Sequence, residues 1–125
     1  MICLKWKRQW GGSDHIVWIN VRKLDALWRF DKGFYLPRGR SEHIRRLLLK
    51  NLATKTKVEM PHVGYWEGRV SFTDGRHRFA WCRDHGVKYM PVTVEGRKQV
   101  ALFQRLFATK VRVCAVPNHV LDAGI

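Results

Sequence analysis

The sequence predicts a single α+β domain with one small mixed sheet and three helices. Segments rich in β-branched and aromatic residues alternate with segments whose apolar residues recur at helical spacing. No Pro-, Gly- or Ser-rich linker, internal repeat or low-complexity tract divides the 125 residues, and this length fits one domain. We therefore expect one domain over residues 1–125.

The first half of the chain is expected to form a strand, a loop and a helix. Ile16–Val21 is β-branched and aromatic and follows the Gly11–Ser13 break, which predicts a strand. Asp31–Arg40 contains Pro37 and two glycines and is expected to be a loop. Ser41 is the expected N-cap of the first helix. That helix has an apolar stripe at Ile44, Leu47, Leu48 and Leu52 and a basic solvent face at His43, Arg46 and Lys50.

The middle of the chain predicts a β-hairpin followed by a short helix. The strands His62–Tyr65 and Arg69–Phe72 flank a Trp66-Glu67-Gly68 turn. A helix is expected from Arg76 to His85, with Gly86 as the residue that ends it.

The last part predicts a strand at Val87–Val94, a helix at about Arg97–Thr109 and a final strand at Lys110–Val116. Pro91 lacks a backbone N–H, which favours an edge position or an irregular start for its strand. The helix presents Val100, Phe103 and Phe107 on one face.

Composition excludes several classes of protein. Hydrophobic residues make up 46% of the chain, with six Trp and six Phe, which excludes wholesale disorder. No apolar run approaches the roughly 20 residues that cross a bilayer, and the N-terminus lacks the charge order of a secretory signal. Cys3, Cys82 and Cys114 match neither a disulfide framework nor a zinc spacing, and the histidines show no metal-binding pattern. We expect a cytoplasmic protein with no membrane partner and no bound metal, with Cys82 buried.

The formal net charge of +14 points to an anionic partner. Residues 1–50 hold 12 of the 24 basic residues and 4 of the 10 acidic ones. Trp6 and Trp10, flanked by charges, are the expected exposed rings, whereas Trp18, Trp28 and Trp81 are expected mainly in the core. Cations beside exposed rings suit nucleic acid. The candidate nucleic-acid contacts are Lys5, Lys7, Arg8, Arg38, Arg40, Arg45 and Arg46.

The most informative stretch is Val70–Arg78, where a strand meets a helix through an Asp-Gly turn. The first N–H groups of a helix lack internal partners and carry partial positive charge. Gly75 tolerates positive φ and lets a ligand approach the backbone. Arg76, His77 and Arg78 add cationic or imidazole donors at the same point. Together they predict a phosphate-sized anion site.

Simpler interpretations exist for each of these residues. Asp74 alone is more often a helix N-cap than a catalytic group, and His77 alone is more often a surface or hydrogen-bonding side chain than a proton shuttle. Three cationic groups at a positive helix end, however, oppose folding. A cluster that breaks the local rule is a candidate site.

The region Pro61–Val94 resembles the signature region of the ParB/sulfiredoxin superfamily. The matching pieces are Asp74-Gly75-Arg76-His77-Arg78-Phe79-Ala80, His85-Gly86-Val87 and Met90-Pro91-Val92-Thr93-Val94. Ile16–Leu24 and the helix from Ser41 fit the same family's opening strand and first helix. The resemblance spans about residues 14–95, the expected core of the domain, and leaves the helix and strand of residues 97–116 as an addition to it.

In that family the box binds nucleotide phosphates: CTP in partition proteins, ATP in sulfiredoxins, and ADP or ATP in free-serine kinases. The resemblance implies that Gly75, Arg76, His77 and Arg78 contact the phosphates of CTP or ATP with magnesium, and that Asp74 fixes the turn or acts as a base or metal ligand. Arg76 stands where sulfiredoxins carry their reactive cysteine, which argues against sulfinic-acid reduction. The 30 residues after Glu95 leave little room for the DNA-reading domain of partition proteins.

We therefore expect a DNA-associated protein, encoded by a plasmid or phage, that binds nucleic acid and a nucleotide. One alternative is an enzyme, a nuclease or phosphotransferase, in which His77 or Asp74 handles a proton. A two-metal mechanism is weakly supported because the carboxylates are dispersed, although folding could bring Asp25 or Asp31 near Asp74. A further alternative is a protein-interaction module without a ligand.

Overall fold

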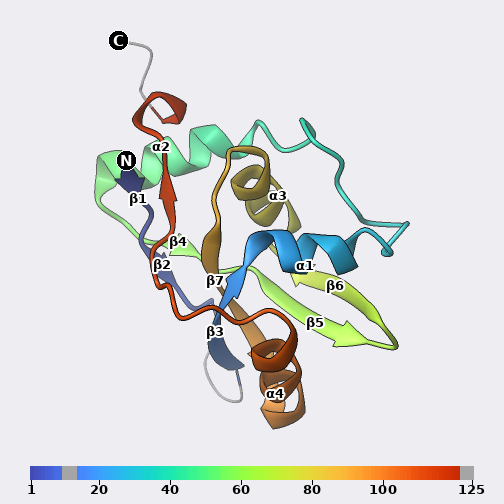
Figure 1. The fold of residues 1–125 in the computed structure, drawn as a ribbon. Coiled ribbons are helices and arrows are strands. Elements are labelled where there is room, and N and C mark those ends of the chain that lie inside the picture. The colour runs from blue at the N-terminus through green and yellow to red at the C-terminus, as the bar shows by residue number, and fades with distance from the viewer. Residues whose placement is uncertain (10–13, 122–125) are drawn as a thin grey trace.

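A computed structural model describes residues 1–9 and 14–121. Within those residues the chain forms four α-helices, one four-stranded sheet and two short two-stranded pairs, an α+β arrangement as expected (Figure 1). The helices are α1 (Val21–Trp28), α2 (Ile44–Thr54), α3 (Arg76–Asp84) and α4 (Gly96–Leu106), followed by a short 3-10 turn, η1 (Asn118–Val120).

The main sheet has the order β3-β7-β5-β6. Its strands are β3 (Asp14–Asn20), β7 (Tyr89–Glu95), β5 (His62–Trp66) and β6 (Arg69–Asp74). β3 and β7 are antiparallel over their full length, as are β5 and β6, whereas β5 and β7 run parallel and pair only at His62 and Thr93. The mixed sheet is therefore two antiparallel halves joined at one point.

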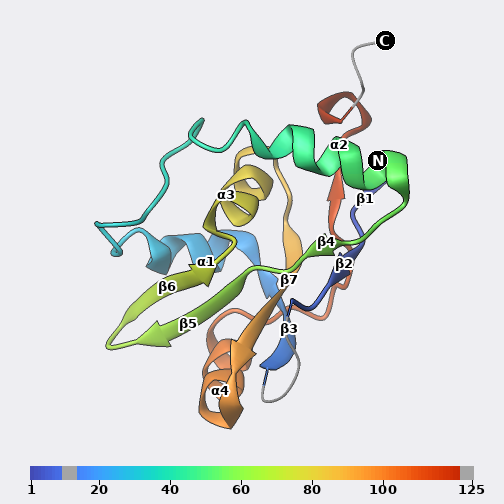
Figure 2. The ribbon, with the colours of Figure 1, turned by 180° about the vertical axis from the view of Figure 1, so that it is seen from behind.

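Two short pairs extend the structure beside this sheet. β1 (Ile2–Cys3) is antiparallel to β8 (Ala115–Val116), and β2 (Trp6–Lys7) is parallel to β4 (Val58–Glu59). α1 packs on β6 and β3, α4 on β3, β5 and β7, and α2 on α3. In both ribbon views α2 and α4 lie at opposite ends of the molecule (Figures 1 and 2). No helix in the described part of the chain is long and apolar enough to cross a bilayer.

Aromatic side chains fill the centre of the core. The ring of Trp28 makes edge-to-face contacts with Tyr35 and Phe72 at 4.8 Å and with Phe79 at 5.5 Å, a geometry that suits the charge distribution of aromatic rings. Trp28, Trp81 and Cys82 are fully buried, as expected.

Trp6 was expected to be exposed and Trp18 to lie mainly in the core, and both are partly buried. Trp6 packs against the core, so its expected exposure is wrong in part. Trp10 and the Gly11–Ser13 break lie outside the described residues.

The hairpin and the helix after it agree with the sequence prediction. Glu67 and Gly68 both have positive φ, 52° and 79°, the backbone that a tight two-residue hairpin turn requires. Gly86 has φ 79° just beyond the end of α3, where a left-handed residue terminates a helix.

The sequence prediction missed helix α1, which begins at Val21 directly after β3. Asn20 caps it, because its side chain accepts a hydrogen bond from the Lys23 N–H at 3.1 Å. The expected strand continued to Val21, whereas the structure places Val21, Leu24 and Trp28 on the buried face of the helix. A β-branched residue at the strand end concealed the change from strand to helix.

Ser41 is not the N-cap of the next helix. α2 begins at Ile44 after His43, and the buried Ser41 hydroxyl instead contacts a histidine of α3. Of the expected apolar stripe, Ile44 and Leu48 are buried, while Leu47 and Leu52 are 40% and 38% exposed.

The final strand expected at Lys110–Val116 is also wrong over most of its length. Only Ala115–Val116 forms a strand, β8, and Val111 and Val113 are exposed. Alternating valines predicted pairing, but no strand pairs with residues 110–114 in the described part of the chain. The preceding helix, α4, ends at Leu106, with Phe103 and Phe107 buried.

Pro91 lies in β7, an inner strand rather than an edge strand. The N–H of Thr93 donates to the Pro61 carbonyl at 2.9 Å on the β5 side. Alternate backbone groups of a strand point to the same side, so the nitrogen of Pro91 faces the same way. β5 and β7 pair only at His62 and Thr93, so Pro91 removes no ladder hydrogen bond.

Candidate phosphate-binding site

A pocket of about 560 Å³ lies where α3 begins. Helix α2 also starts here, since His43 and Ile44 line the pocket together with the first residues of α3. The lining residues are Phe34, His43, Ile44, Phe72, Thr73, Asp74, Gly75, Arg76, His77 and Arg78. The structure thus gathers all five residues of the sequence-predicted box around one cavity.

The start of α3 is electropositive. Its N-cap is Gly75, which has no side chain to cap the helix, and its first turn contains no acidic residue. The first N–H groups of a helix have no intrahelical partner, and the helix dipole adds partial positive charge there. The pocket wall therefore offers backbone donors beside Arg76 and His77, an arrangement that suits an anion.

Gly75 is required by the backbone and by its neighbours. Its φ is 82°, and a Cβ there would lie 2.7 Å from the Pro61 Cα and 2.8 Å from Nη2 of Arg78. The sequence prediction of positive φ is correct. The space beside Gly75, however, is taken by protein atoms, so the glycine allows close packing rather than the approach of a ligand.

Asp74 and Arg78 tie the pocket floor to the N-terminal segment. Oδ2 of Asp74 accepts hydrogen bonds from Nε2 of Gln9 and, at 3.2 Å, from Nη2 of Arg78. Nε of Arg78 donates to the Glu59 carbonyl at 2.8 Å, and the Arg78 side chain is only 14% exposed. These contacts give both residues a structural role and leave Arg78 less available to a ligand than the sequence predicted.

Asp74 is held as a carboxylate. Burial raises its pKa, but the hydrogen bonds from Gln9 and Arg78, the charge of Arg78 and the Gly75 N–H lower it by more, so the net pKa lies below the ordinary aspartate value. A carboxylate with a depressed pKa is a poor proton acceptor at neutral pH. Of the two expected catalytic residues, Asp74 is therefore the weaker candidate for a base.

Arg76 lies at the mouth of the pocket over Phe34. Its guanidinium carbon is 5.3 Å from the centroid of that ring, and Nη1 donates to the Phe34 carbonyl at 3.3 Å. Phe34 itself is 62% exposed. A guanidinium positioned by an aromatic ring keeps further donors for an incoming oxyanion.

His77 is the titratable group that best fits a role in chemistry. Its Nδ1 lies 3.0 Å from the Ser41 Oγ, and its ring meets that of His43 edge-on with centroids 4.6 Å apart. Burial, followed by the positive charges of His43 and Arg76, lowers the pKa of His77. The imidazole is therefore neutral at neutral pH, as a general base must be.

The predicted nucleic-acid contacts divide between two regions. Lys5, Lys7 and Arg8 are exposed in and directly beside β2, although Arg8 also donates to the Asp14 carbonyl at 3.1 Å. Arg38, Arg40 and Arg46 are exposed on the loop before α2 and on α2 itself.

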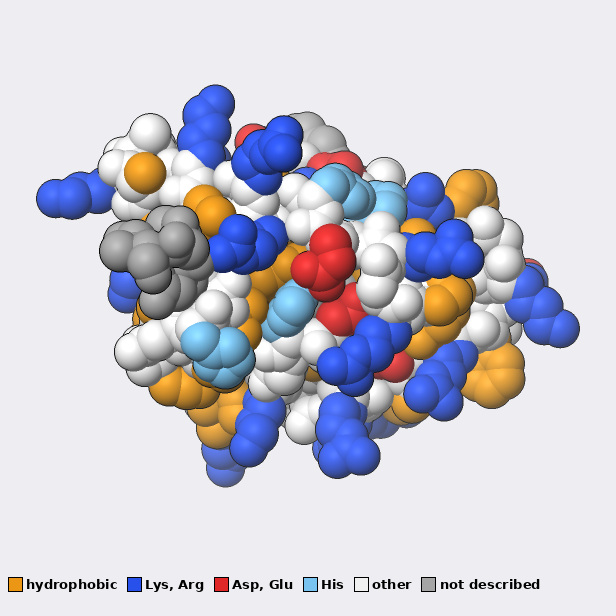
Figure 3. Space-filling model, turned by 90° about the horizontal axis from the view of Figure 1, so that it is seen from above, with side chains coloured by type: hydrophobic (Ala, Val, Ile, Leu, Met, Phe, Trp, Pro, Cys, Tyr) orange, Lys and Arg blue, Asp and Glu red, His pale blue; other side chains and the backbone are white. Residues whose placement is uncertain are grey.

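Neither Arg45 nor the distribution of the basic side chains fits a single continuous binding face. Arg45 is half-buried, and its Nε donates to the Val120 carbonyl at 3.0 Å, which fixes the C-terminal turn. Seen from above, Lys and Arg side chains surround acidic and histidine side chains and do not merge into one patch (Figure 3).

No metal centre is formed by the described residues, in which no group of three His, Cys, Asp or Glu side chains could hold an ion. Asp25 does not join Asp74, because its carboxylate pairs with Arg83 at 3.0 Å and with Arg29 at 3.7 Å. This result weakens any mechanism that depends on clustered carboxylates.

Sequence reasoning missed four residues that complete the site: Gln9, Phe34, Ser41 and His43. Each lies at least 30 residues from the box and reaches it only through folding. His43 was expected on the solvent face of its helix, and its position one residue before that helix is what places it opposite His77. No local pattern could have paired it with α3.

The geometry defines an α+β protein with a pocket at an electropositive helix start. Comparison with known proteins adds two findings. The model of a family described as "Plasmid Fertility inhibition factor" matches residues 49–108, slightly less than half of the chain. That segment includes the hairpin, α3 and the box.

One solved structure resembles the whole fold: the crystal structure of "Oncogenic Suppression Activity Protein - A Plasmid Fertility Inhibition Factor", as its gold(I) cyanide derivative. It has a TM-score of 0.57 and 19% sequence identity over 90% of this chain. At that identity the likeness shows the fold alone. The chain spans 65% of the length of that solved chain. No curated protein matches the sequence.

Proposed function

We propose that this chain is a plasmid-associated protein of the fertility-inhibition type, which lowers the transfer of a plasmid by binding DNA phosphates at the start of α3 in the cytoplasm. The matched family segment and the fold of the solved fertility inhibition factor support the biological part of this proposal. The ParB/sulfiredoxin resemblance of the box supports the phosphate part.

The observation that carries the proposal is the convergence at the α3 pocket. Arg76, His77 and His43 surround the uncapped start of α3 in a cavity of about 560 Å³. Arg76 and two imidazoles stand at a positive helix end where acidic residues would favour folding, so an anionic ligand is the simplest reason for this arrangement. The overall charge of +14 favours a polymeric anion as the partner.

Two measurements on one set of variants test this proposal. Donor cells that express the protein should yield fewer plasmid recipients, and Arg76→Ala with His77→Ala should restore transfer. The purified protein should bind DNA with an affinity that falls steeply with salt, and the same variant should bind more weakly. Lys98→Ala on α4, away from the pocket, is the matched control. Unchanged inhibition by the double variant would contradict the proposal.

The ParB/sulfiredoxin resemblance also implies a nucleotide ligand. The volume and the lining of the α3 pocket can be compared with what a nucleotide requires. Its volume lies within the range of ligand pockets, and the α3 start with Arg76 suits phosphates. Asp74 is the carboxylate that lines it, so a magnesium ion would depend mainly on phosphate oxygens. Thermal stability measured with ATP or CTP, each with and without magnesium, should rise with the logarithm of ligand concentration once that concentration exceeds Kd. Arg76→Ala should abolish the rise.

An enzymatic role is the second candidate function, and the lowered pKa of His77 favours it. A neutral imidazole at the phosphate pocket could accept a proton from water or a hydroxyl group, while Arg76 and the α3 N–H groups would stabilise charge on phosphorus. Cleavage of plasmid DNA or turnover of ATP should then disappear in His77→Ala. Activity that survives this substitution would remove His77 from the mechanism.

A further inference from the structure

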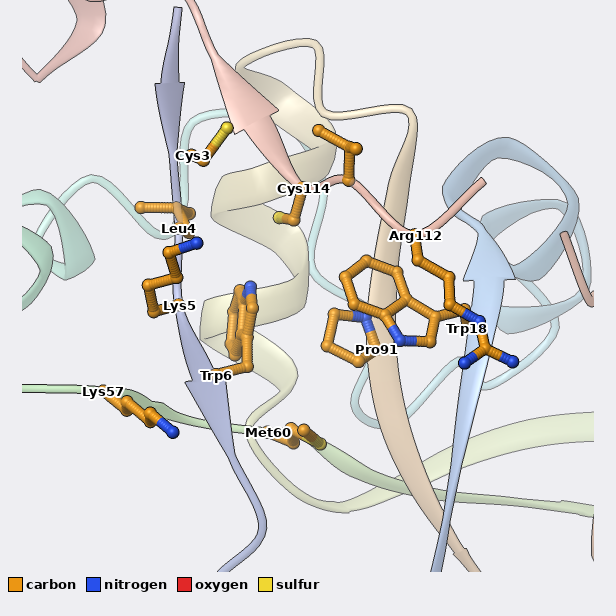
Figure 4. Close-up of a pocket in the computed structure, with 11 residues that line it drawn as sticks. Cys3, Leu4, Lys5, Trp6, Trp18, Lys57, Met60, Pro91, Arg112 and Cys114 are labelled. Atoms are coloured by element: carbon orange, nitrogen blue, oxygen red, sulfur yellow. The ribbon is translucent and has the colours of Figure 1, made fainter. Parts of the chain in front are cut away.

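A second pocket, of about 300 Å³, lies between the N-terminal strands and the segment that precedes β8 (Figure 4). In the described part of the chain it shares no lining residue with the α3 pocket. Its walls are mainly apolar and aromatic: Figure 4 shows Trp6 on one side and Trp18 with Pro91 on the other. The pocket is therefore an independent site.

Three cations surround these aromatic walls. Lys5 comes from the link between β1 and β2, Lys57 from the segment before β4, and Arg112 from the segment before β8. All three are exposed, and none of the described residues that line the pocket is acidic. Residues from three distant parts of the chain thus bring positive charge to one cavity.

Two of these cations stand immediately before two paired strands, Lys5 before β2 and Lys57 before β4. β2 and β4 are parallel with Trp6 opposite Val58, and the Val58 N–H donates to the Lys5 carbonyl at 2.8 Å. This register places Lys5 and Lys57 one residue before the Trp6–Val58 pair. Like charges brought this close repel one another, so folding alone does not favour this placement.

We propose that this pocket binds one unpaired nucleotide of single-stranded DNA. The base lies against the rings of Trp6 and Trp18, and Lys5, Lys57 and Arg112 contact the adjoining phosphates. Stacking on aromatic side chains beside cations is how proteins hold single strands without reading their sequence. The proposal goes beyond the α3 site, because it names a different cavity and a different part of the ligand.

Size and chemistry favour this occupant. A cavity of about 300 Å³ lies at the lower end of ligand pockets, which suits one base rather than a whole nucleotide cofactor. Paired bases in a duplex expose only their edges in the grooves, so a duplex cannot place a ring face on Trp6. The proposed site is therefore selective for single strands.

Fluorescence anisotropy with four labelled oligonucleotides tests the proposal on the full chain. They are a thymine single strand, the same backbone without bases, a duplex and a uracil RNA strand. We expect the thymine strand to bind more tightly than the abasic strand and the duplex. Trp6→Leu should cut thymine-strand affinity roughly 5- to 150-fold, the range of lost stacking, and leave the abasic strand unchanged.

Surface variants keep the test valid if Trp6→Leu fails to fold. Lys5→Gln with Lys57→Gln should reduce the slope of log affinity against log salt by about 1.4, because each lost phosphate contact on a single strand removes about 0.7. Arg22→Gln with Lys23→Gln on α1 has the same charge change and should leave the slope unaltered.

The outcomes separate this site from the α3 pocket. Arg76→Ala should preserve the preference for the thymine strand over the abasic strand even if it weakens both. Equal binding of thymine and abasic strands would overturn the proposal, as would equal binding of the duplex. Tighter binding of RNA than DNA would overturn the choice of DNA. Displacement of the strand by an acidic tryptophan-containing peptide at equal concentration would identify a protein-docking pocket instead.

Discussion

Gly75 occupies a position where two separate constraints exclude a side chain. Its φ of 82° is costly for other residues, and a Cβ would overlap Pro61 and Arg78. Gly86 has nearly the same φ, 79°, but no atom lies within 4 Å of its Cβ position. Substituting Gly86 therefore measures the cost of a left-handed backbone alone, and substituting Gly75 measures that cost together with steric overlap.

We predict that Gly75→Ala lowers the free energy of unfolding by about 2–4 kcal/mol, whereas Gly86→Ala lowers it by about 1–2 kcal/mol. The second pays only the left-handed backbone cost of roughly 1–2 kcal/mol, and the first adds a steric overlap with backbone that cannot move freely. Urea unfolding followed by circular dichroism measures both. Equal losses would show that Pro61 gives way.

His77 should make stability depend on pH near neutrality. Burial and the charges of His43 and Arg76 hold its pKa below the unfolded value of about 6.5, so the unfolded chain binds the proton more readily. Stability from this residue is therefore complete above pH 6.5 and decreases as pH falls toward the lower, folded pKa.

We predict that His77→Gln loses less stability than the parent chain between pH 7 and pH 5. Glutamine keeps a polar contact for Ser41 but does not titrate. His119→Gln, on the exposed η1 turn, should match the parent. Thermal unfolding at half-unit pH steps provides the measurement, and superimposable curves for His77→Gln and the parent would contradict the prediction.

Single residues were predictable where their role is local. The positive φ of Gly75 and Gly86 follows from turn and helix-end patterns within a few positions. The roles of Asp74 and Arg78 were not, because their partners Gln9 and Glu59 lie 65 and 19 residues away. The sequence predicted that both residues lie at the pocket. It could not show that their side chains are already hydrogen-bonded to distant parts of the chain.

At the scale of elements, Arg83 holds the long connection between α1 and α2 against α3. Its guanidinium donates to Asp25 at 3.0 Å, to Asp84 at 2.9 Å and to the Leu36 carbonyl at 2.6 Å. Asp84 in turn accepts from the Gly39 N–H at 3.1 Å. This loop leads to Ser41 and His43, so the network positions one wall of the α3 pocket.

We predict that Arg83→Met lowers the free energy of unfolding by roughly 3–5 kcal/mol, because it removes the close cation from two buried carboxylates, of which Asp25 keeps only the more distant, exposed Arg29. Residues 29–43 should also become sensitive to protease. Arg29→Met is the matched control: Arg29 pairs with the same Asp25, but its side chain is 69% exposed, so its loss should cost about 1 kcal/mol or less. Similar losses in both variants would reject the assigned role of Arg83.

Elements were predictable where the pattern is complete within one segment. The hairpin β5–β6 has two alternating runs and a two-residue turn, and α3 has a clear start and end. The strand expected at Lys110–Val116 failed because alternation describes one strand and does not supply a partner. Helix α1 was missed because a β-branched strand runs into it without a break.

At the scale of the whole molecule, the charge of +14 surrounds several sites rather than one. Arg38 and Arg40 lie just before the start of α2, while Lys5 and Lys57 share a cavity with Leu52 near its end. Eleven residues of helix span about 16 Å. The exposed Arg46 and Lys50 lie along α2 between these ends. A nucleic-acid strand that follows α2 would meet both groups of cations.

We predict that two paired substitutions at the ends of α2 reduce the salt dependence of DNA binding additively. Arg38→Gln with Arg40→Gln, and Lys5→Gln with Lys57→Gln, should each lower the slope of log affinity against log salt by about 1.4 to 1.8, since each phosphate contact contributes about 0.7 to 0.9. Combining the four substitutions should lower it by about twice as much.

Lys98→Gln with Arg105→Gln supplies the control for net charge. Both side chains are exposed on α4, which lies at the opposite end of the molecule from α2 (Figure 1). This variant removes the same charge and should leave the slope unchanged, because counterions are released only where cations meet phosphates. An equal fall in slope for the α4 variant would mean that DNA binds to overall charge and follows no path along α2.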